Sequence, residues 1–278
     1  PFGKLPGWRL VPLLVKAHDD LRQEQFAAGL VQTFASIWES AGVPVWVRPY
    51  DILATSRDGG LIEAIPDTIS IDALKKGDAE FSTLRRFFVR HFGGGNSRSA
   101  GFQTARRNFI RSTAAYSIIS YLLNIKDRHN GNILLTRDGH VVHIDWGFLL
   151  SNSPGGNLGF ENSIKLTADD LELLRGGAGA REGNLDTFRS LCVRAFLEAR
   201  KHRDRIILQV EMMLDGNEDL PCFRAGKDAV ISALRQRFHP DASPRECYAI
   251  VNRLIDEAAQ SFRTALYDIY QRWSMGIM

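Results

Sequence analysis

The sequence predicts an α+β fold with two unequal parts, a small antiparallel sheet followed by a larger, mainly helical region. The first 65 residues contain short apolar runs separated by turn residues, a pattern typical of strands. Beyond residue 66, apolar residues recur with helical spacing instead. The chain has 278 residues, 44% of them hydrophobic, which is enough to bury a large core or two unequal lobes.

Composition and charge place few limits on function. The net charge of +3 and the sequence pI of about 8.9 suit an anionic nucleotide or membrane surface, but the charge is spread along the chain. Cys192, Cys222 and Cys247 are far apart and lack metal-ligand spacing, which indicates a reducing cytosolic compartment. No signal peptide is evident, and the longest apolar stretch, residues 114–123, is too short to span a bilayer.

The segment 126–147 carries the strongest functional signal. Two short apolar runs flank an Asp-Gly pair at 138–139, which predicts a β-hairpin with a two-residue type I′ turn. In that register Asn132 lies directly opposite Asp145, with Cβ atoms about 5 Å apart. An amide oxygen and a carboxylate so placed suit Mg²⁺, which prefers hard oxygen ligands.

A loop just upstream of Asn132 adds further reactive groups. Asp127, Arg128 and His129 supply an acid, a cation and an imidazole beside the predicted metal ligands. A histidine with an ordinary pKa near 6.5 suits general acid–base chemistry at neutral pH. Each of these residues alone is more typical of a polar surface hairpin, and only their combination favours a catalytic site.

The other elements are predicted in chain order. Residues 8–15 predict an edge strand, because Pro12 cannot donate to a ladder, and Lys16 ends it. Asp20 predicts a helix N-cap, with Gln23 at the capping-box position. Further strands of the same antiparallel sheet are predicted over 43–47, 51–55 and 61–65, and helices over 81–92, 104–125, 188–200 and 206–214, with two more beginning at the caps Thr167 and Ser243.

Several motifs together resemble the phosphatidylinositol 3-/4-kinase superfamily. DRHNGN followed by HIDWG is similar to its catalytic loop and metal-binding segment, and K-x-x-DDLRQE to its lysine and acidic-helix signature. SPGGN…KLT, RKHRDRIILQVEMM and LPCF are closest to the phosphatidylinositol 4-kinases, in particular the type III beta kinases. Trp146 stands where the family usually has phenylalanine. The resemblance implies a two-lobed protein-kinase-like fold, with residues 1–65 as a truncated N-lobe and 66–278 as the C-lobe of a longer protein.

The resemblance also implies roles for individual residues. Lys16 would contact the ATP phosphates, and acidic residues of the following helix would orient it. Asn132 and Asp145 would bind the metal, while His129, assisted by Asp127, would take the proton from the attacking hydroxyl. The implied nucleotide-binding positions are Asp19, Glu24, Tyr50, the gatekeeper Ile62 and the hinge residues Glu63 and Ile65, whose backbone groups would bind adenine.

The implied function is that of a phosphatidylinositol 4-kinase, which transfers the ATP γ-phosphate to the inositol 4-hydroxyl of phosphatidylinositol. Mg²⁺, or Mn²⁺ in its place, would be the cofactor. Lys165 is the only cation of the activation loop after Gly147, which favours an unphosphorylated headgroup because arginine and lysine are what bind phosphate. Two alternatives stay open: a protein serine/threonine kinase of the related superfamily, and a catalytically silent kinase-like scaffold.

The resemblance implies a cellular setting as well. The expected partners are phosphatidylinositol in membranes, ATP, and Golgi-associated small GTPases and adaptor proteins, without nucleic acid. The expected location is cytoplasmic and peripheral, on Golgi or endosomal-type membranes. A C-terminal amphipathic segment, residues 267–278, is suited either to a bilayer interface or to docking on the large lobe.

Overall fold

The computed structural model describes residues 2–8, 10–154, 164–175 and 183–260. The strands are β1 (Leu13–Ala17), β2 (Ile52–Ser56), β3 (Gly59–Glu63), β4 (Thr68–Ser70), β5 (Ile133–Thr136) and β6 (Val141–His143). The α-helices are α1 (Arg22–Ser40), α2 (Ile71–Gly77), α3 (Leu84–His91), α4 (Ala100–Leu123), α5 (Ala168–Arg175), α6 (Gly183–Lys201), α7 (Arg203–Leu214), α8 (Lys227–Arg237) and α9 (Pro244–Gln260). Short 3₁₀ turns are η1 (Phe2–Lys4), η2 (Asn130–Asn132) and η4 (Pro221–Phe223).

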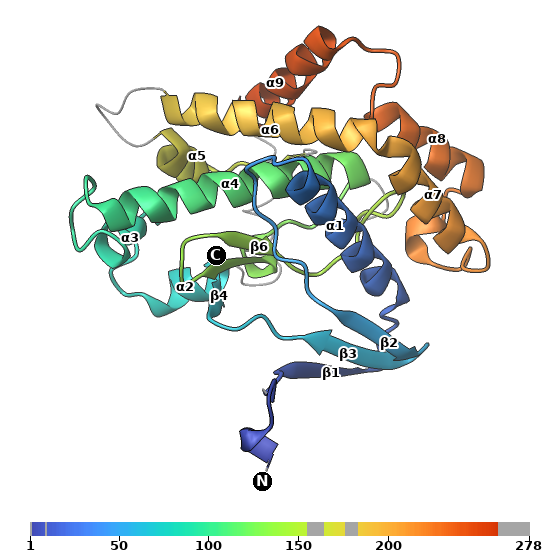
Figure 1. Cartoon of the computed structure of the whole chain (residues 1–278), viewed down its shortest axis with the longest axis horizontal. Coiled ribbons are helices and arrows are strands. Elements are labelled where there is room, and N and C mark those ends of the chain that lie inside the picture. Colours follow the sequence, from blue (N-terminus) through green and yellow to red (C-terminus); the bar gives the residue numbers. More distant parts are fainter. Residues whose placement is uncertain (1, 9, 155–163, 176–182, 261–278) are drawn as a thin grey trace.

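These elements form a layered arrangement that confirms the predicted α+β class. Figure 1 shows the sheet of β1, β2 and β3 at one end of the molecule and the stacked helices α4, α6 and α9 at the other. The sheet of β4, β5 and β6 lies between them. The division into lobes at residues 65 and 66 stays a prediction.

The first sheet is antiparallel in the order β1-β3-β2, so β3 is its central strand. β1 begins after Pro12 and not at residue 8 as predicted, because proline has no N–H with which to extend the ladder. Lys16 of β1 lies opposite Gly60 of β3. A Cβ atom at Gly60 would lie 2.2 Å from the Leu53 carbonyl oxygen, so only glycine fits where β3 passes between its neighbours.

The prediction of a strand over residues 43–47 was wrong. The main chain of this segment bonds to helices, since the N–H of Val43 donates to the carbonyl of Trp38 in α1 (2.9 Å). The N–H of Trp46 donates to the carbonyl of Arg111 in α4 (3.3 Å). The apolar run therefore packs over α4 instead of joining the sheet. The other two predicted strands of this sheet are confirmed, with small shifts at their ends.

The second sheet contains the predicted hairpin, but its turn has three residues, 137–139, and not two. The N–H of Thr136 donates to the carbonyl of His140 across this turn (2.9 Å). Gly139 has a φ of +86°, which is the geometry of a three-residue loop closed by a glycine bulge. A Cβ atom at Gly139 would lie 2.8 Å from the Cβ of Ala105 in α4, so packing against α4 also requires glycine here.

The additional turn residue changes the strand register. Ile133 pairs with His143, so Ile144 and not Asp145 lies opposite Asn132. The N–H of Ile144 donates to the carbonyl of Asn132 (3.1 Å). The predicted register was therefore wrong by one residue, a shift that reverses the face to which each side chain points. Asp145 follows the ladder, and its orientation is set by a left-handed backbone conformation with a φ of +63°.

Helix α4 forms the centre of the helical region and is buried on nearly all sides in its second half, as predicted. It packs along α6, which in turn packs against α9. The indole N–H of Trp38 in α1 donates to the carbonyl of Ala195 in α6 (2.9 Å) and joins α1 to this layer. Among the described residues, no helix combines the length and apolarity needed to cross a bilayer.

The predicted helix caps had different outcomes. The N–H of Ser243 donates to the carboxylate of Glu246 (2.7 Å), and the N–H of Glu246 donates to the hydroxyl of Ser243 (3.3 Å), which confirms the capping box of α9. Thr167 caps α5 with its hydroxyl, also as predicted. Asp20 is not the N-cap of α1, because Leu21 occupies that position. The Asp20 carboxylate accepts from the N–H of Arg22, the first residue of the helix (3.1 Å), and pairs with the Arg22 guanidinium (2.6 Å).

Candidate active site

A buried arginine fixes the loop before β5 against the segment that follows β6. Arg128, 5% exposed, donates to the carbonyl of Lys126 (3.0 Å) within its own loop. It also donates to the carbonyls of Ile144 (2.7 Å) and Asp145. Its guanidinium lies 5.3 Å from the ring of Trp146. We call this set of contacts the Arg128 clamp; it makes the loop and the segment after β6 one unit.

Two aspartates of this unit have left-handed backbone conformations. The φ angles of Asp127 and Asp145 are +62° and +63°. This conformation costs roughly 1–2 kcal/mol for most residues other than glycine, although aspartate and asparagine tolerate it better. Such outliers persist where surrounding contacts impose them, and they are concentrated at functional sites. Here the imposing contacts are the clamp and the bond from the N–H of Lys126 to the carbonyl of Phe148 (2.9 Å).

His129 lies beside Asp127, but both of its ring nitrogens face groups of this loop. Nδ1 accepts from the N–H of Gly131 (3.0 Å), so the neutral ring carries its proton on Nε2, 3.8 Å from the Asp127 carboxylate. Burial lowers the pKa of His129; Asp127 raises it, while the Arg128 and Lys165 cations lower it further. The imidazole is therefore neutral at pH 7. To accept a proton on Nδ1, the ring must first break its hydrogen bond with the Gly131 N–H.

Lys16, which is predicted to contact the nucleotide phosphates, lies in an acidic group formed by Asp19 and Glu24, the residues predicted to orient it. The Nζ of Lys16 lies 3.9 Å from the carboxylate of Asp19. Glu24 is half-buried in the first turn of α1, and its pKa is raised to about 7, first by burial and then by the charges of Asp145 and Asp19. The structure thus brings together residues from β1, from α1 and the turn before it, and from the segment after β6.

Because the pKa of Glu24 is raised, this residue should lower the free energy of unfolding as the pH rises. Between the ordinary value of 4.5 and about 7, the folded protein keeps a proton that the unfolded chain releases, so stability falls as pH rises through this window. Glu24→Gln, which is neutral at every pH, should therefore gain stability relative to the wild type across this window, by up to about 3 kcal/mol above pH 7. Urea unfolding in the presence of a chelator, from pH 4.5 to pH 8, measures the difference.

The control for Glu24→Gln is Glu39→Gln, at an exposed glutamate near the end of the same helix. Its free energy of unfolding should stay within about 0.5 kcal/mol of the wild type, as is usual for surface substitutions. A constant offset between Glu24→Gln and the wild type at all pH values would contradict the assignment.

Tyr50 lies next to this acidic group. Its ring is buried, at 6% exposure. Burial raises the pKa of the Tyr50 hydroxyl, and the charge of Glu24 raises it further, while a hydrogen bond with the Asp145 main chain opposes the change. Tyr50 therefore contacts both parts of the candidate site, the acidic residue Glu24 and the segment after β6.

The predicted gatekeeper and hinge occupy β3 and the chain that follows it. Ile62 is half-buried in β3, which ends at Glu63. The N–H of Glu63 donates to the carbonyl of Asp51 (2.8 Å), and the Thr68 hydroxyl donates to the carbonyl of Ile65 (2.9 Å). Since the Glu63 N–H and the Ile65 carbonyl have these partners, the groups predicted to bind adenine are the Glu63 carbonyl and the Ile65 N–H. These adenine contacts stay a prediction.

The two predicted metal ligands are connected through the clamped loop and not by strand pairing. The side-chain N–H of the buried Asn132 donates to the carbonyl of Asp127 (3.1 Å), which turns the amide oxygen away from that carbonyl. The carboxylate of Asp145 is exposed, and one of its oxygens accepts from the N–H of Gly147 (3.2 Å). An amide oxygen and a carboxylate are the candidate ligand atoms.

These residues fit a hard divalent cation. Amide and carboxylate oxygens are the ligands that Mg²⁺ accepts, usually one or two from protein with phosphate and water completing the shell. The charge of Asp145 raises the pKa of Glu24, so a cation beside Asp145 would offset a repulsion that the structure contains. Within the described ranges, no group of three or more His, Cys, Asp or Glu side chains is arranged to hold a metal ion.

Gln23 is a site residue that sequence analysis missed. Its side-chain amide donates to the carbonyls of Trp146 (3.1 Å) and Gly147 (2.7 Å). Its amide oxygen accepts from the N–H of Cys222 (3.0 Å), so one buried side chain joins α1, the segment after β6 and η4. The available signal was its helical spacing with Ala27, which places the glutamine on the buried face of α1.

Trp146, the departure from the usual family residue, is accommodated as a packing residue. Its side chain is fully buried, and its ring stacks beneath the guanidinium of Arg128. The indole N–H has no hydrogen-bond partner among the residues described. The larger ring is therefore held by packing, while the exposed Asp145 before it keeps its orientation through the main chain.

Some predictions fall outside the described residues. They include the central part of the activation loop, 155–163, and the C-terminal segment 267–278. Lys165 is described, and its charge contributes to lowering the pKa values of His129 and His143. The one cation of the activation loop therefore lies close enough to the clamped loop to act on it electrostatically.

The fold and the candidate site together define a kinase-like domain, with a lysine-bearing sheet beside α1 and the loop held by the Arg128 clamp. A family model described as phosphatidylinositol 3- and 4-kinase matches residues 10–223. The chain belongs to this phosphatidylinositol 3- and 4-kinase family.

Individual relatives are similar along the whole chain. It is 47% identical over 278 residues to the phosphatidylinositol 4-kinase of Dictyostelium discoideum, covering 100% of the chain and 23% of the relative. It is 46% identical over 279 residues to phosphatidylinositol 4-kinase beta 1 of Arabidopsis thaliana, at 100% and 24% coverage. Against phosphatidylinositol 4-kinase beta of Xenopus laevis, identity is 42% over 280 residues, at 100% and 33% coverage. The chain thus spans a quarter to a third of the length of these relatives.

Proposed function

We propose that this chain is the catalytic domain of a phosphatidylinositol 4-kinase. The observation that carries the proposal is the similarity of the entire chain to proteins of that name, at 42% identity in Xenopus laevis and 47% in Dictyostelium discoideum. In this reaction the γ-phosphoryl group of ATP passes to the 4-hydroxyl of phosphatidylinositol. The product is phosphatidylinositol 4-phosphate.

The nucleotide would lie between the first sheet and the clamped loop. Lys16 offsets phosphate charge and is held by Asp19, 3.9 Å away. Asn132 and Asp145 would hold Mg²⁺, or Mn²⁺ in its place. When bound, such an ion supplies positive charge at the β- and γ-phosphate oxygens.

Proton transfer is assigned to Asp127 and His129. The imidazole of His129 is neutral at pH 7, because burial lowers its pKa, and it can take the proton of the inositol hydroxyl once Nδ1 leaves the Gly131 N–H. The Asp127 carboxylate, 3.8 Å from Nε2, stabilises the imidazolium that forms. Because positioning and charge stabilisation contribute most of the rate in phosphoryl transfer, the Arg128 clamp is as important as the base.

The acceptor is proposed to be phosphatidylinositol without further phosphates. Between Gly147 and Thr167 the sequence contains one cation, Lys165, and no arginine. Headgroups that already carry phosphates require several cationic side chains. The cytoplasmic location, peripheral on Golgi or endosomal-type membranes, and the small GTPase and adaptor partners rest on the family resemblance and stay proposals.

A competition assay tests the reaction class. The full-length protein receives radiolabelled ATP and Mg²⁺ together with phosphatidylinositol vesicles and casein in one mixture. We expect label in the lipid and none in the casein. Label in casein alone would identify a protein kinase, and Mg-ATP binding without transfer to either acceptor would identify a silent scaffold.

A further inference from the structure

A hollow of about 720 Å³ lies between the first half of α4 and the first half of α6. We call it the α4–α6 groove. It has no part in the proposed catalytic site, since its lining residues come from α4, α6 and the single residue Pro44. Arg111 lies roughly 18 Å along the helix axis from Leu123, where α4 ends and the catalytic loop follows.

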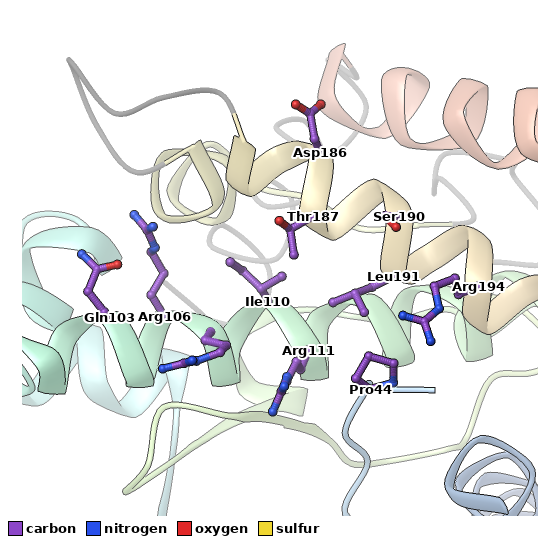
Figure 2. Close-up of a pocket in the computed structure, with 11 residues that line it drawn as sticks. Pro44, Gln103, Arg106, Ile110, Arg111, Asp186, Thr187, Ser190, Leu191 and Arg194 are labelled. Carbon is purple, nitrogen blue, oxygen red and sulfur yellow. The ribbon is translucent and has the colours of Figure 1, made fainter. Parts of the chain in front are cut away.

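The α4–α6 groove is strongly basic. Four arginines line it, three from α4 (Arg106, Arg107 and Arg111) and Arg194 from α6, against one acid, Asp186. In Figure 2, Arg106 and Arg194 reach into the space between the helices from opposite sides, while the carboxylate of Asp186 points away from α4. The single acid is therefore poorly placed to neutralise the four guanidinium groups.

Arg106 is largely buried and forms no ion pair with a described carboxylate. Its side chain is 8% exposed, and its guanidinium lies 5.5 Å from the ring of Phe102. Burial lowers the pKa of Arg106, and the neighbouring Arg85 lowers it further. Among the residues described, no carboxylate pairs with Arg106, Arg111 or Arg194. Because the guanidinium lines the groove, an anion bound there would pair with a charge that no described carboxylate neutralises.

The lining also has features of a ligand site. Its volume falls within the range of small-molecule pockets, and the buried side chains of Ile110 and Leu191 provide apolar surface between the arginines. Ser190 of α6 adds a hydroxyl, and Gln103 of α4 adds an amide. Guanidinium groups bind phosphate through two parallel hydrogen bonds, and the hydroxyl and amide supply further donors.

We propose that the α4–α6 groove binds a ligand with clustered phosphate groups, separate from the nucleotide site. Guanidinium groups from both helices bind the phosphates, and the apolar residues between them contact the ligand's scaffold. A soluble polyphosphorylated molecule and a phosphoinositide headgroup share this chemistry. Occupancy would join α4, which leads into the catalytic loop, to α6, and so would stabilise the helical layer beneath the active site.

Binding is measured by calorimetry on the full-length protein with inorganic pyrophosphate, at near-physiological salt and with a chelator present to exclude metal-dependent binding elsewhere. The test variant is Arg111→Gln/Arg194→Gln, which leaves the buried Arg106 in place. Its control is Arg205→Gln/Arg235→Gln, which removes the same charge from exposed positions on α7 and α8. We expect the test variant to bind pyrophosphate at least tenfold more weakly than the wild type, and the control to stay within about twofold.

Two further arms identify the ligand's source and the role of Arg106. Sedimentation with phosphatidylcholine vesicles containing a few per cent phosphatidylinositol 4-phosphate tests the headgroup. Loss of vesicle binding in the test variant, together with competition by pyrophosphate, supports a membrane ligand; pyrophosphate binding alone supports a soluble one. The milder Arg106→Lys should weaken either interaction, because lysine lacks the bidentate fork.

The proposal is overturned if the wild type binds neither probe, or if the test variant binds both as well as the control does. Lipid phosphorylation at saturating substrate should be equal in the test and control variants without added ligand. Measuring lipid phosphorylation in this way distinguishes an error in the proposed phosphate-binding groove from an error in the proposed catalytic function.

Discussion

Asp145→Asn should lower ATP-dependent phosphorylation of phosphatidylinositol by roughly a thousandfold or more, because the substitution removes the carboxylate of the proposed metal site. Asparagine suits this position, since it tolerates the left-handed backbone that Asp145 adopts at a φ of +63°. It also keeps an oxygen that can accept from the Gly147 N–H. Because the side chain is exposed, we expect the free energy of unfolding to change by less than about 1 kcal/mol.

The matched control is Asp138→Asn, an exposed aspartate in the turn at the other end of the same hairpin. It should leave the rate within about twofold of the wild type, as surface substitutions away from a site normally do. Initial rates on phosphatidylinositol vesicles and urea unfolding curves measure the two effects. An Asp145→Asn protein that turns over at the wild-type rate would remove the metal assignment.

Arg128→Lys should have the second largest effect, although it conserves the charge. The guanidinium donates to the carbonyls of Lys126 (3.0 Å), Ile144 (2.7 Å) and Asp145, and an ammonium group cannot span these three acceptors. Because buried carbonyls would lose their partners, we expect a loss of about 3 kcal/mol in the free energy of unfolding. The catalytic loop and Asp145 would also shift relative to each other, which should lower kcat roughly a hundredfold.

Arg86→Lys, at an exposed arginine of α3, is the control for the Arg128 clamp. It should change neither stability nor rate beyond the spread of ordinary surface substitutions. Urea unfolding reports the stability, and kcat is measured at a temperature where both variants remain folded. If Arg128→Lys matched Arg86→Lys in both measurements, the clamp would not be what orients Asp145.

The sequence allowed the fold class, most of the helices and the chemical types of the candidate site residues to be predicted, because these depend on local pattern. The helices α2 and α8 were not predicted. The hairpin was predicted from its Asp-Gly pair, but its register was not. That register depends on Gly139, whose backbone lies so close to Ala105 that a Cβ atom would be 2.8 Å from the alanine Cβ. A two-residue turn with Asp-Gly and a three-residue loop ending in glycine both fit this sequence, so the turn sequence alone does not set the register.

Two further errors have the same origin. The apolar run 43–47 has the composition of a strand, yet its main chain bonds to α1 and α4, and only the tertiary structure reveals those partners. Gln23 fits a capping box by spacing, but its amide is taken by the carbonyls of Trp146 and Gly147, more than a hundred residues away. Polar side chains that join distant segments cannot be inferred from local sequence rules.

The position of the transferred phosphate tests the central claim most directly. The full-length protein is incubated with radiolabelled ATP, Mg²⁺ and phosphatidylinositol vesicles, and the lipid product is then deacylated and separated by chromatography against standards for each inositol position. The account predicts label at the 4-hydroxyl. Label at the 3-hydroxyl, or no labelled lipid from a protein that binds Mg-ATP, would contradict it.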